Sequence, residues 1–366
     1  MSLRLVITGG GTGGHLFPGI AVADAVLADV PGSDVLFIGT GREIDRKALA
    51  GKPYRQATLT GSGLKGISWR GRLASLARLP VGLWQAWRLL RNFKPDLVLG
   101  VGGYVTGPVL LAARLMGVTT AIHEQNSVPG LANRLLGRFV DLVFLSLPGS
   151  EAGFPPAKIR LVGNPLRSEL LAAARKVESE SRATRGGEAA LLVLGGSQGA
   201  RRVNQLILEA VAELQREGLV PRVVHQTGGL DLVQVQQGYR EMGVAARVEP
   251  FIADMASVYA AADLVVSRAG ATTLAELALF GKPALLIPYP YAADDHQRHN
   301  AEIMARRGAA RVLNEAELSG VELAAELRTL LADPDRRREM AARARELATP
   351  DAAQKIIAQG RLLAGV

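Results

Sequence analysis

A histidine near the N-terminus directly follows a glycine-rich run, in the sequence VITGGGTGGH that ends at His15. Such a run after a strand lets the backbone approach a phosphate, and the unpaired amides of the following helix point at the anion. A neutral imidazole at the start of that helix can accept a proton near neutral pH, because the helix N-terminus disfavours its charged form. A tight turn without a ligand and a packing histidine are the structural alternatives. Together, the loop and His15 favour a proton acceptor beside a phosphate site.

A second group of polar residues lies in SRAGATTLAELALFGKPALLIPYPYAADDHQRHNA, residues 267–301. AGATT is expected to open a helix, whose amides from Gly270 to Thr273 would be available to a diphosphate. Glu276 is predicted in the first turn, where a carboxylate can accept hydrogen bonds from both hydroxyls of a ribose. The alternative is a favourable charge at a helix N-terminus. The motif as a whole favours the ligand role.

Metal and cofactor chemistry has weak support in the sequence. The absence of cysteine excludes disulfides, cysteine-type zinc sites and thiol nucleophiles. Asp294 and Asp295 resemble a metal-binding pair, but they adjoin a predicted helix start, where capping is the commoner role. After the aliphatic run DVLFIG the chain continues with Thr40, Gly41 and Arg42, where a dinucleotide-binding domain usually carries an acidic ribose ligand. We therefore expect neither a metal nor a cofactor.

Both polar groups require helices that begin at the carboxyl ends of strands, and the aliphatic pattern supplies them. Short aliphatic runs alternate with helical stretches, which predicts parallel sheets with helices on both faces. After a polar stretch behind Gly163, the pattern restarts with ALLVLGG and a second glycine-rich turn, GGSQGA. The fold class expected is α/β, with two doubly wound Rossmann-like domains that face each other across a cleft.

The length of 366 residues suits two domains. The boundaries expected are 1–163 for an N-terminal domain and 164–348 for a C-terminal domain. The stretch 349–366 is predicted to form a final helix, which packs on its own domain or returns to the first.

The basic charge is concentrated in the first half of the chain. Residues 46–95 contain eleven Lys and Arg and no Asp or Glu, which indicates an anionic partner. All three tryptophans, Trp69, Trp84 and Trp87, fall in this stretch, interleaved with arginines, which is typical of a segment that lies among anionic lipid headgroups. A crossover helix that buries its tryptophans is the alternative, and both can hold for different faces. No apolar run reaches the length of a transmembrane helix, so we expect a soluble or peripheral protein.

Seven motifs together resemble the MurG family over nearly the whole chain. They occur in the order of that family: GGGTGGHLFPG, GVGGYVTGP, HEQNSVPGLANR, GNPLR, GGSQGA, SRAGATTLAE and DDHQRHNA. The resemblance implies a GT-B glycosyltransferase that inverts the anomeric centre without a metal. Its donor would be UDP-N-acetylglucosamine and its acceptor a lipid-linked N-acetylmuramyl-pentapeptide pyrophosphate, the step from lipid I to lipid II in peptidoglycan synthesis. The protein would work at the cytoplasmic face of the cell membrane, with the N-terminal domain binding acceptor and membrane and the C-terminal domain binding the donor.

The resemblance also implies roles for individual residues. His15 would be the catalytic base, and Ile252 would hold the uracil through its backbone. The residues implied on the donor side are Thr12, Gly13, Gly14, Asn126, Arg167, Ser197, Ile252, Ala271, Thr272, Thr273, Leu274, Ala275, Glu276 and Gln297. Those assigned to the acceptor or membrane side are Tyr104, Glu124, Trp69, Arg72, Arg78, Trp84 and Arg88. Some members of the family carry a second glutamine where this chain has His296, which leaves sugar contacts at that position open.

Two other classes of function fit parts of the sequence. A UDP-sugar epimerase could use the same two-domain fold and donor, but it would need no lipid acceptor and no surface of tryptophan and arginine. A nucleotide-regulated protein that binds a membrane or a nucleic acid would explain the basic half, but not the pairing of His15 with a sugar-binding motif. We therefore expect no nucleic-acid partner.

Overall fold

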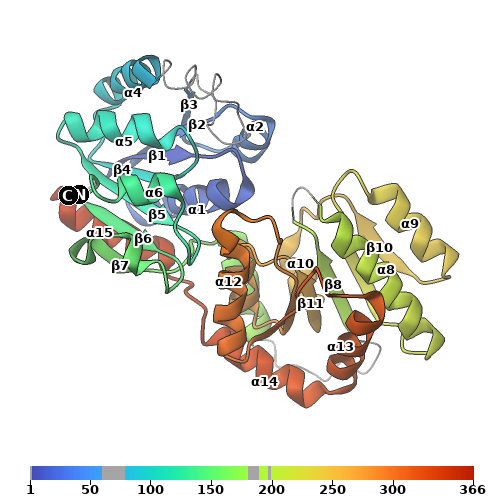
Figure 1. The fold of residues 1–366 in the computed structure, drawn as a ribbon. Coiled ribbons are helices and arrows are strands. Elements are labelled where there is room, and N and C mark those ends of the chain that lie inside the picture. The colour runs from blue at the N-terminus through green and yellow to red at the C-terminus, as the bar shows by residue number, and fades with distance from the viewer. Residues whose placement is uncertain (1, 60–78, 180–188, 197–198) are drawn as a thin grey trace. The chain divides into compact units, whose positions relative to one another are not determined.

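The chain forms two compact units, each with its own parallel sheet (Figure 1). The structure is a computed structural model that describes residues 2–59, 79–179, 189–196 and 199–366. The first unit comprises Met1–Ser168 together with Thr349–Val366, and the second unit comprises Glu169–Ala348.

The described part of the first unit contains a sheet of seven parallel strands in the order β3-β2-β1-β4-β5-β6-β7. Its strands are β1 (Arg4–Gly9), β2 (Asp34–Gly39), β3 (Arg55–Thr58), β4 (Leu97–Gly102), β5 (Thr119–Glu124), β6 (Leu142–Leu145) and β7 (Ile159–Leu161). Its helices are α1 (Gly13–Asp29), α2 (Glu43–Leu49), α4 (Leu79–Phe93), α5 (Thr106–Leu115), α6 (Leu131–Leu136) and the C-terminal α15 (Ala352–Ala364). The order around β1 is that of a Rossmann sheet, in which the winding direction reverses between β1 and β4.

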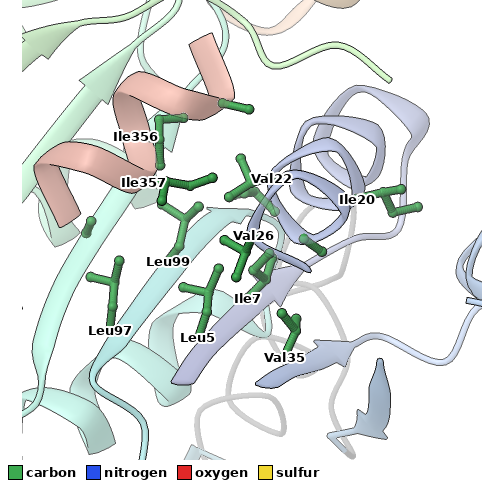
Figure 2. Packing of buried hydrophobic residues seen from close by; sticks show 14 of the residues in the cluster. Leu5, Ile7, Ile20, Val22, Val26, Val35, Leu97, Leu99, Ile356 and Ile357 are labelled. Atoms are coloured by element: carbon green, nitrogen blue, oxygen red, sulfur yellow. The ribbon is translucent and has the colours of Figure 1, made fainter. Parts of the chain in front are cut away.

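The central strands β1, β2 and β4 of the first sheet are buried on both faces, because their sequences are apolar almost without interruption. Along β1, Leu5 and Ile7 pack with α1, while Val6 between them packs on the opposite face with α4 and α5. Successive side chains of a strand point to opposite faces, so a continuous apolar run requires helices on both sides. Figure 2 shows Ile356 and Ile357 of α15 within the first of these cores, near Leu99 of β4. The C-terminal helix therefore belongs to the first unit.

The second unit repeats this construction. In its described residues, six parallel strands lie in the order β10-β9-β8-β11-β12-β13. They are β8 (Ala190–Leu194), β9 (Arg222–Gln226), β10 (Ala246–Glu249), β11 (Leu264–Ser267), β12 (Ala284–Leu286) and β13 (Ala310–Val312). The helices are α7 (Ser168–Ser179), α8 (Arg201–Arg216), α9 (Leu232–Glu241), α10 (Met255–Ala261), α11 (Ala271–Phe280), α12 (His296–Arg306), α13 (Gly320–Ala332) and α14 (Pro334–Arg345). The predicted fold class, two doubly wound α/β sheets, is confirmed.

In the second unit, too, the alternating side chains of a strand pack into two separate hydrophobic cores, one on each face of the sheet. Leu191 and Val193 of β8 pack with α8 and α13, whereas Leu192 and Leu194 pack with α10, α11 and α12. Every helix in the described ranges falls short of the length and apolar character that a bilayer crossing demands.

Candidate active site

Two glycine-rich loops meet at the reversal point of the first sheet, one after β1 and one after β4. The amide of Gly10 donates to the carbonyl of Gly102 at 3.2 Å. A Cβ on Gly103 would stand 2.8 Å from the carbonyl oxygen of Gly10, so a side chain there would collide with backbone. The glycines let the two loops touch backbone to backbone, at the position where ligands bind in open α/β sheets.

His15 lies in the first turn of α1, over the second of these loops. The helix begins at Gly13 with Thr12 as its N-cap, and the Thr12 Oγ1 is 3.2 Å from the His15 Nδ1. The half-buried imidazole packs against Gly102, where a built Cβ would stand 2.7 Å from its Cδ2. The structure therefore brings Thr12, Gly13 and His15 together at the helix start that the sequence predicted.

Two residues beside this loop were missed by the sequence analysis. The buried carboxylate of Asp45 accepts hydrogen bonds from the amides of Gly11 and Thr40, each at 2.8 Å. It therefore fixes the loop from the side of β2 and occupies one of the loop's amides. The Arg42 guanidinium carbon lies 6.0 Å from the centre of the Tyr104 ring, and a Cβ on Gly11 would stand 3.5 Å from its Nη1.

The sequence did contain a signal for both residues. The segment TGREID follows the aliphatic run DVLFIG directly, so its charges had to lie at the carboxyl edge of the sheet. From the sequence alone, Thr40, Gly41 and Arg42 indicated only that the usual acidic ribose ligand is missing. The acid that faces the loop comes three residues after Arg42.

Glu124 organises the loop that follows β5. Its buried carboxylate accepts hydrogen bonds from the Asn126 amide at 3.0 Å and from the Asn126 Nδ2 at 3.3 Å. The Gly130 amide and the Asn133 Nδ2 donate to its other oxygen at 3.1 and 2.8 Å. Its geometry is that of a group that positions Asn126.

Arg167 and Tyr104 lie close to α1 and its loops. The Arg167 guanidinium carbon is 5.0 Å from the centre of the Phe17 ring, in the second turn of α1. Tyr104 follows the β4 glycines, and burial raises the pKa of its phenol, so it remains a hydrogen-bond donor at neutral pH. These two residues therefore join His15 around one end of α1.

In the second unit, the predicted donor residues fall on loops and helix starts at the carboxyl edge of the sheet. Ser197 lies outside the described residues. The Ile252 amide donates to the Gln226 Oε1 at 3.0 Å, at the end of β9. The Ile252 amide, which is part of the backbone through which the resemblance implies uracil binding, is therefore already engaged by a side chain in this structure.

Helix α11 carries Glu276 differently from the prediction. The helix runs over Ala271–Phe280 with Gly270 as its N-cap, and its first turn contains no acidic residue. Glu276 is its sixth residue and belongs to the second turn, so the prediction of a first-turn position was wrong. The alternative role, a favourable interaction of the Glu276 charge with the helix N-terminus, is therefore weakened, because that interaction fades beyond the first turn. Its carboxylate is buried and accepts a hydrogen bond from the Tyr259 hydroxyl at 2.8 Å.

Gln297 and Asn300 of α12 support the loop before α11. The Gln297 Oε1 accepts hydrogen bonds from the Ala269 amide at 3.3 Å and from the Tyr289 amide at 3.0 Å. The Asn300 Nδ2 donates to the Ala269 carbonyl at 3.3 Å. Gln297 therefore lies beside the helix start that contains Ala271 to Thr273. Its carbonyl oxygen is used by the fold, and its amide nitrogen is the part suited to a ligand.

Asp294 and Asp295 precede α12, both with a positive φ of about 50°. Asp295 occupies the N-cap position of α12, but its side chain makes no capping hydrogen bond and lies 3.7 Å from the Arg298 Nη1. Within the described ranges, no three His, Asp or Glu side chains are grouped closely enough to hold a metal ion.

Helices α4, α5 and α6 carry a group of exposed apolar side chains, which we call the α4–α6 surface. Trp84 is 61% exposed and Trp87 is 37% exposed, so the alternative of fully buried tryptophans is wrong for this helix. Ala86, Leu90 and Phe93 of α4 are buried instead. The members of the surface are Val81, Trp84, Trp87, Leu111, Leu115, Leu131 and Leu135, together with Phe139 just beyond α6.

Arginines accompany these apolar side chains. The Arg88 guanidinium carbon lies 5.9 Å from the centre of the Trp84 ring. Arg91, Arg114, Arg134 and Arg138 are exposed on the same helices and the turn that follows them. The other members of the predicted membrane segment, Trp69, Arg72 and Arg78, lie outside the described residues.

Comparison with protein families finds two matches that together cover most of the chain. Residues 5–145 match the glycosyltransferase family 28 N-terminal domain, and residues 190–356 match the glycosyltransferase family 28 C-terminal domain. The first match contains the glycine-rich loops after β1 and β4, and the second contains all six described strands of the second sheet.

Among curated proteins, the chain is 48% identical to a relative from Geobacter sp. (strain M21), over 97% of this chain and 95% of the relative. A relative from Syntrophus aciditrophicus is 44% identical over 98% of each chain. Both are named UDP-N-acetylglucosamine--N-acetylmuramyl-(pentapeptide) pyrophosphoryl-undecaprenol N-acetylglucosamine transferase.

Among solved structures, the crystal structure of MurG from Acinetobacter baumannii matches with a TM-score of 0.77 and 30% identity, over 98% of this chain and 99% of that chain. A putative UDP-N-acetylglucosamine 2-epimerase from Listeria monocytogenes matches with a TM-score of 0.70 over 99% of this chain and 96% of that chain. Its identity is 17%, so this second likeness concerns the fold alone.

Proposed function

We propose that this chain, which belongs to the MurG family of UDP-N-acetylglucosamine--N-acetylmuramyl-(pentapeptide) pyrophosphoryl-undecaprenol N-acetylglucosamine transferases, uses His15 as the base of that reaction. It is a glycosyltransferase of the GT-B fold and acts in peptidoglycan synthesis, from lipid I to lipid II. The epimerase alternative is not favoured. The likeness to the epimerase structure, at 17% identity, concerns the fold alone, whereas the relatives at 44% and 48% identity carry the transferase name. We further propose which residues carry out this reaction and that the protein binds a membrane surface.

The observation that carries the base assignment is the environment of His15. Thr12 contacts its Nδ1, and the Gly102 backbone lies against the ring. When Nδ1 carries the ring proton and donates a hydrogen bond to the Thr12 Oγ1, the Nε2 lone pair is the basic site. This tautomer suits an imidazole that receives a proton from an acceptor hydroxyl.

The chemical step follows from this arrangement. The oxygen of the acceptor hydroxyl attacks the anomeric carbon of N-acetylglucosamine as its proton passes to the Nε2 of His15. The bond from that carbon to the diphosphate breaks, and UDP leaves with the electron pair. A single displacement inverts the anomeric centre. Arg167 and the first amides of α11 would stabilise the charge that develops on the diphosphate.

The second unit is proposed to hold the donor. Glu276 would accept hydrogen bonds from the ribose hydroxyls, the helix start at Ala271 to Thr273 would bind the diphosphate, and Gln297 would contact the sugar. Leu274 and Ala275 complete the same turn of helix. The support for this assignment is that a buried carboxylate, a helix start and an amide side chain share one edge of the sheet.

The α4–α6 surface is proposed to bind the cytoplasmic face of the cell membrane, with the protein attached peripherally. Exposed tryptophan, phenylalanine and leucine beside arginine match the chemistry of an anionic lipid interface. This placement would bring the first unit, which carries His15, to the membrane in which a lipid-linked acceptor resides.

An assay with defined substrates tests the proposed reaction. The purified protein is mixed with UDP-N-acetylglucosamine, with and without a lipid-linked muramyl-pentapeptide acceptor, and both UDP and sugar products are measured. UDP release that depends on the acceptor, with a new disaccharide on the lipid, is the expected result. A new UDP-sugar without acceptor would identify an epimerase, and binding without turnover would identify a regulated binding protein.

A further inference from the structure

A buried tyrosine supports the carboxylate of Glu276 from the neighbouring helix. Tyr259 of α10 is completely buried, and its hydroxyl donates to the Glu276 Oε2 at 2.8 Å. The hydroxyl is a neutral donor, so it holds the carboxylate without neutralising its charge.

The position of the Tyr259 ring is fixed by α11 itself. Its ring centre lies 5.2 Å from that of Phe280, and the two planes are inclined by 21°. Glu276 and Phe280 are four residues apart, so they occupy the same face of α11. The tyrosine therefore packs along one face, with its ring on Phe280 and its hydroxyl on Glu276.

Both ends of α10 are also held in place. The buried Lys282, just beyond α11, donates from its Nζ to the Ala262 carbonyl at 2.7 Å. At the other end, the Asp254 carboxylate caps the helix by accepting a hydrogen bond from the Ser257 amide at 3.1 Å. Tyr259 is thus a donor whose location is set by the fold before any ligand binds.

We propose that Tyr259 is a positioning residue, whose hydroxyl orients the Glu276 carboxylate for the ribose of the uridine diphosphate donor. The inference rests on the proposed role of Glu276 as the ribose ligand. A carboxylate held at one oxygen has its plane set in advance, so less orientational freedom is lost when the ribose hydroxyls bind.

The test compares two nucleotides that differ only in the ribose hydroxyls. Calorimetry measures the Kd of UDP and of 2′,3′-dideoxy-UDP for the wild type and for Tyr259→Phe. The substitution keeps the ring stacked on Phe280 and removes only the donor. We expect the affinity for UDP to fall roughly tenfold, as for the loss of a hydrogen bond to a charged group. The Kd of the dideoxy nucleotide should not change, which also shows that the variant is folded.

Tyr239→Phe is the matched control within the same unit. Tyr239 is also buried, and its hydroxyl lies 3.1 Å from the His225 Nδ1, so the variant loses one buried hydroxyl away from Glu276. Both nucleotides should bind Tyr239→Phe as they bind the wild type. An equal loss of both nucleotides in Tyr259→Phe would indicate a merely structural role and overturn the proposal.

Glu276→Gln separates a failure of the inference from a failure of the proposed function. If Glu276→Gln binds UDP normally, Glu276 is not the ribose ligand, and both the donor assignment and the positioning role fall. If Glu276→Gln weakens UDP but Tyr259→Phe does not, the positioning role alone is wrong. The proposal predicts that the double variant binds UDP no more weakly than Glu276→Gln alone.

Discussion

The imidazole of His15 lies directly against the backbone of Gly102, with its Cδ2 and Nε2 at 2.7 and 2.9 Å from the point where a Cβ at residue 102 would stand. Gly102 also has a φ of +110°, which residues with a side chain rarely adopt. The proposed base is therefore positioned by a loop that follows a different strand from its own, and the absence of a side chain at residue 102 is what makes room for it.

Gly102→Ala should consequently impair catalysis by displacing His15. A general base contributes on the order of 10² to 10⁴ in rate, and we expect the variant to lose a large part of that factor in kcat. The Kd of UDP, measured by calorimetry, should change little, because Glu276 and the start of α11, which are proposed to bind the ribose and the diphosphate, belong to the second unit. Normal turnover by Gly102→Ala would show that the imidazole position is not critical.

Gly107→Ala is the control for that experiment. A Cβ on Gly107, in the first turn of α5, would meet nothing within 4 Å. The same change of residue type on the same segment should therefore leave kcat close to that of the wild type.

Glu276→Ala tests the donor assignment through UDP binding alone. Loss of a charged hydrogen-bonding group should weaken UDP by about 1.5 to 3 kcal/mol, as measured by calorimetry without acceptor. Glu315→Ala removes a second, partly buried acid of the same unit, which pairs with Arg268, and serves as the comparison. If both variants bind UDP like the wild type, Glu276 does not contact the nucleotide.

The proposed membrane contact predicts a charge-dependent association with lipid. Replacing Arg88, Arg134 and Arg138 by Gln should reduce co-sedimentation with vesicles that contain anionic phospholipid, and added salt should reduce it for the wild type. Turnover on a soluble acceptor analogue should survive, because these arginines lie on the α4–α6 surface and not around His15.

The control for the membrane experiment removes the same number of positive charges from the second unit. Arg306, Arg336 and Arg338 are exposed on the second unit, and their replacement by Gln should leave vesicle binding nearly intact. Equal vesicle binding by the wild type and the α4–α6 variant would remove the basis for this contact.

Two buried histidines predict that acid destabilises the protein. Burial lowers the pKa of His123 to about 4 and that of His225 to about 3, from an ordinary value of 6.5. Below pH 6.5 the unfolded chain binds protons that the folded chain excludes, so the free energy of unfolding falls as pH decreases. The slope is up to about 1.4 kcal/mol per pH unit for each histidine, from about pH 6.5 down to the folded pKa, with no contribution above pH 6.5.

Urea unfolding between about pH 5 and pH 7 measures this slope. His225→Gln removes one titrating group and should make the dependence on pH shallower, whatever its effect on stability at neutral pH. A slope that His225→Gln does not alter would contradict the assignment.

The sequence predicted the parts of the site that depend on local pattern. Aliphatic runs followed by glycines located the helix starts at His15 and near Ala271, because a strand, a turn and a helix start are encoded by neighbouring residues. The packing of Asp45 on the glycine loop was not predicted, since it depends on which strand lies beside β1. The support of Glu276 by Tyr259 likewise joins residues of two helices that only the folded sheet brings together.

The position of Glu276 in α11 was the other difference between prediction and structure. Glu276 was placed one turn too early because a helix start is difficult to locate within a run of small residues such as RAGATT. The short shift matters chemically, since it moves the carboxylate away from the helix N-terminus and onto the face that Tyr259 covers.

The measurement that tests the central claim most directly is the turnover of His15→Ala on UDP-N-acetylglucosamine and the lipid-linked acceptor, alongside its Kd for UDP. We expect kcat to fall by roughly 10² to 10⁴ while the Kd of UDP changes little. We also expect wild-type turnover to persist in the presence of a chelator. Near-normal turnover by His15→Ala, or a wild type that chelator silences and magnesium restores, would contradict a mechanism in which His15 is the base and no metal is obligatory.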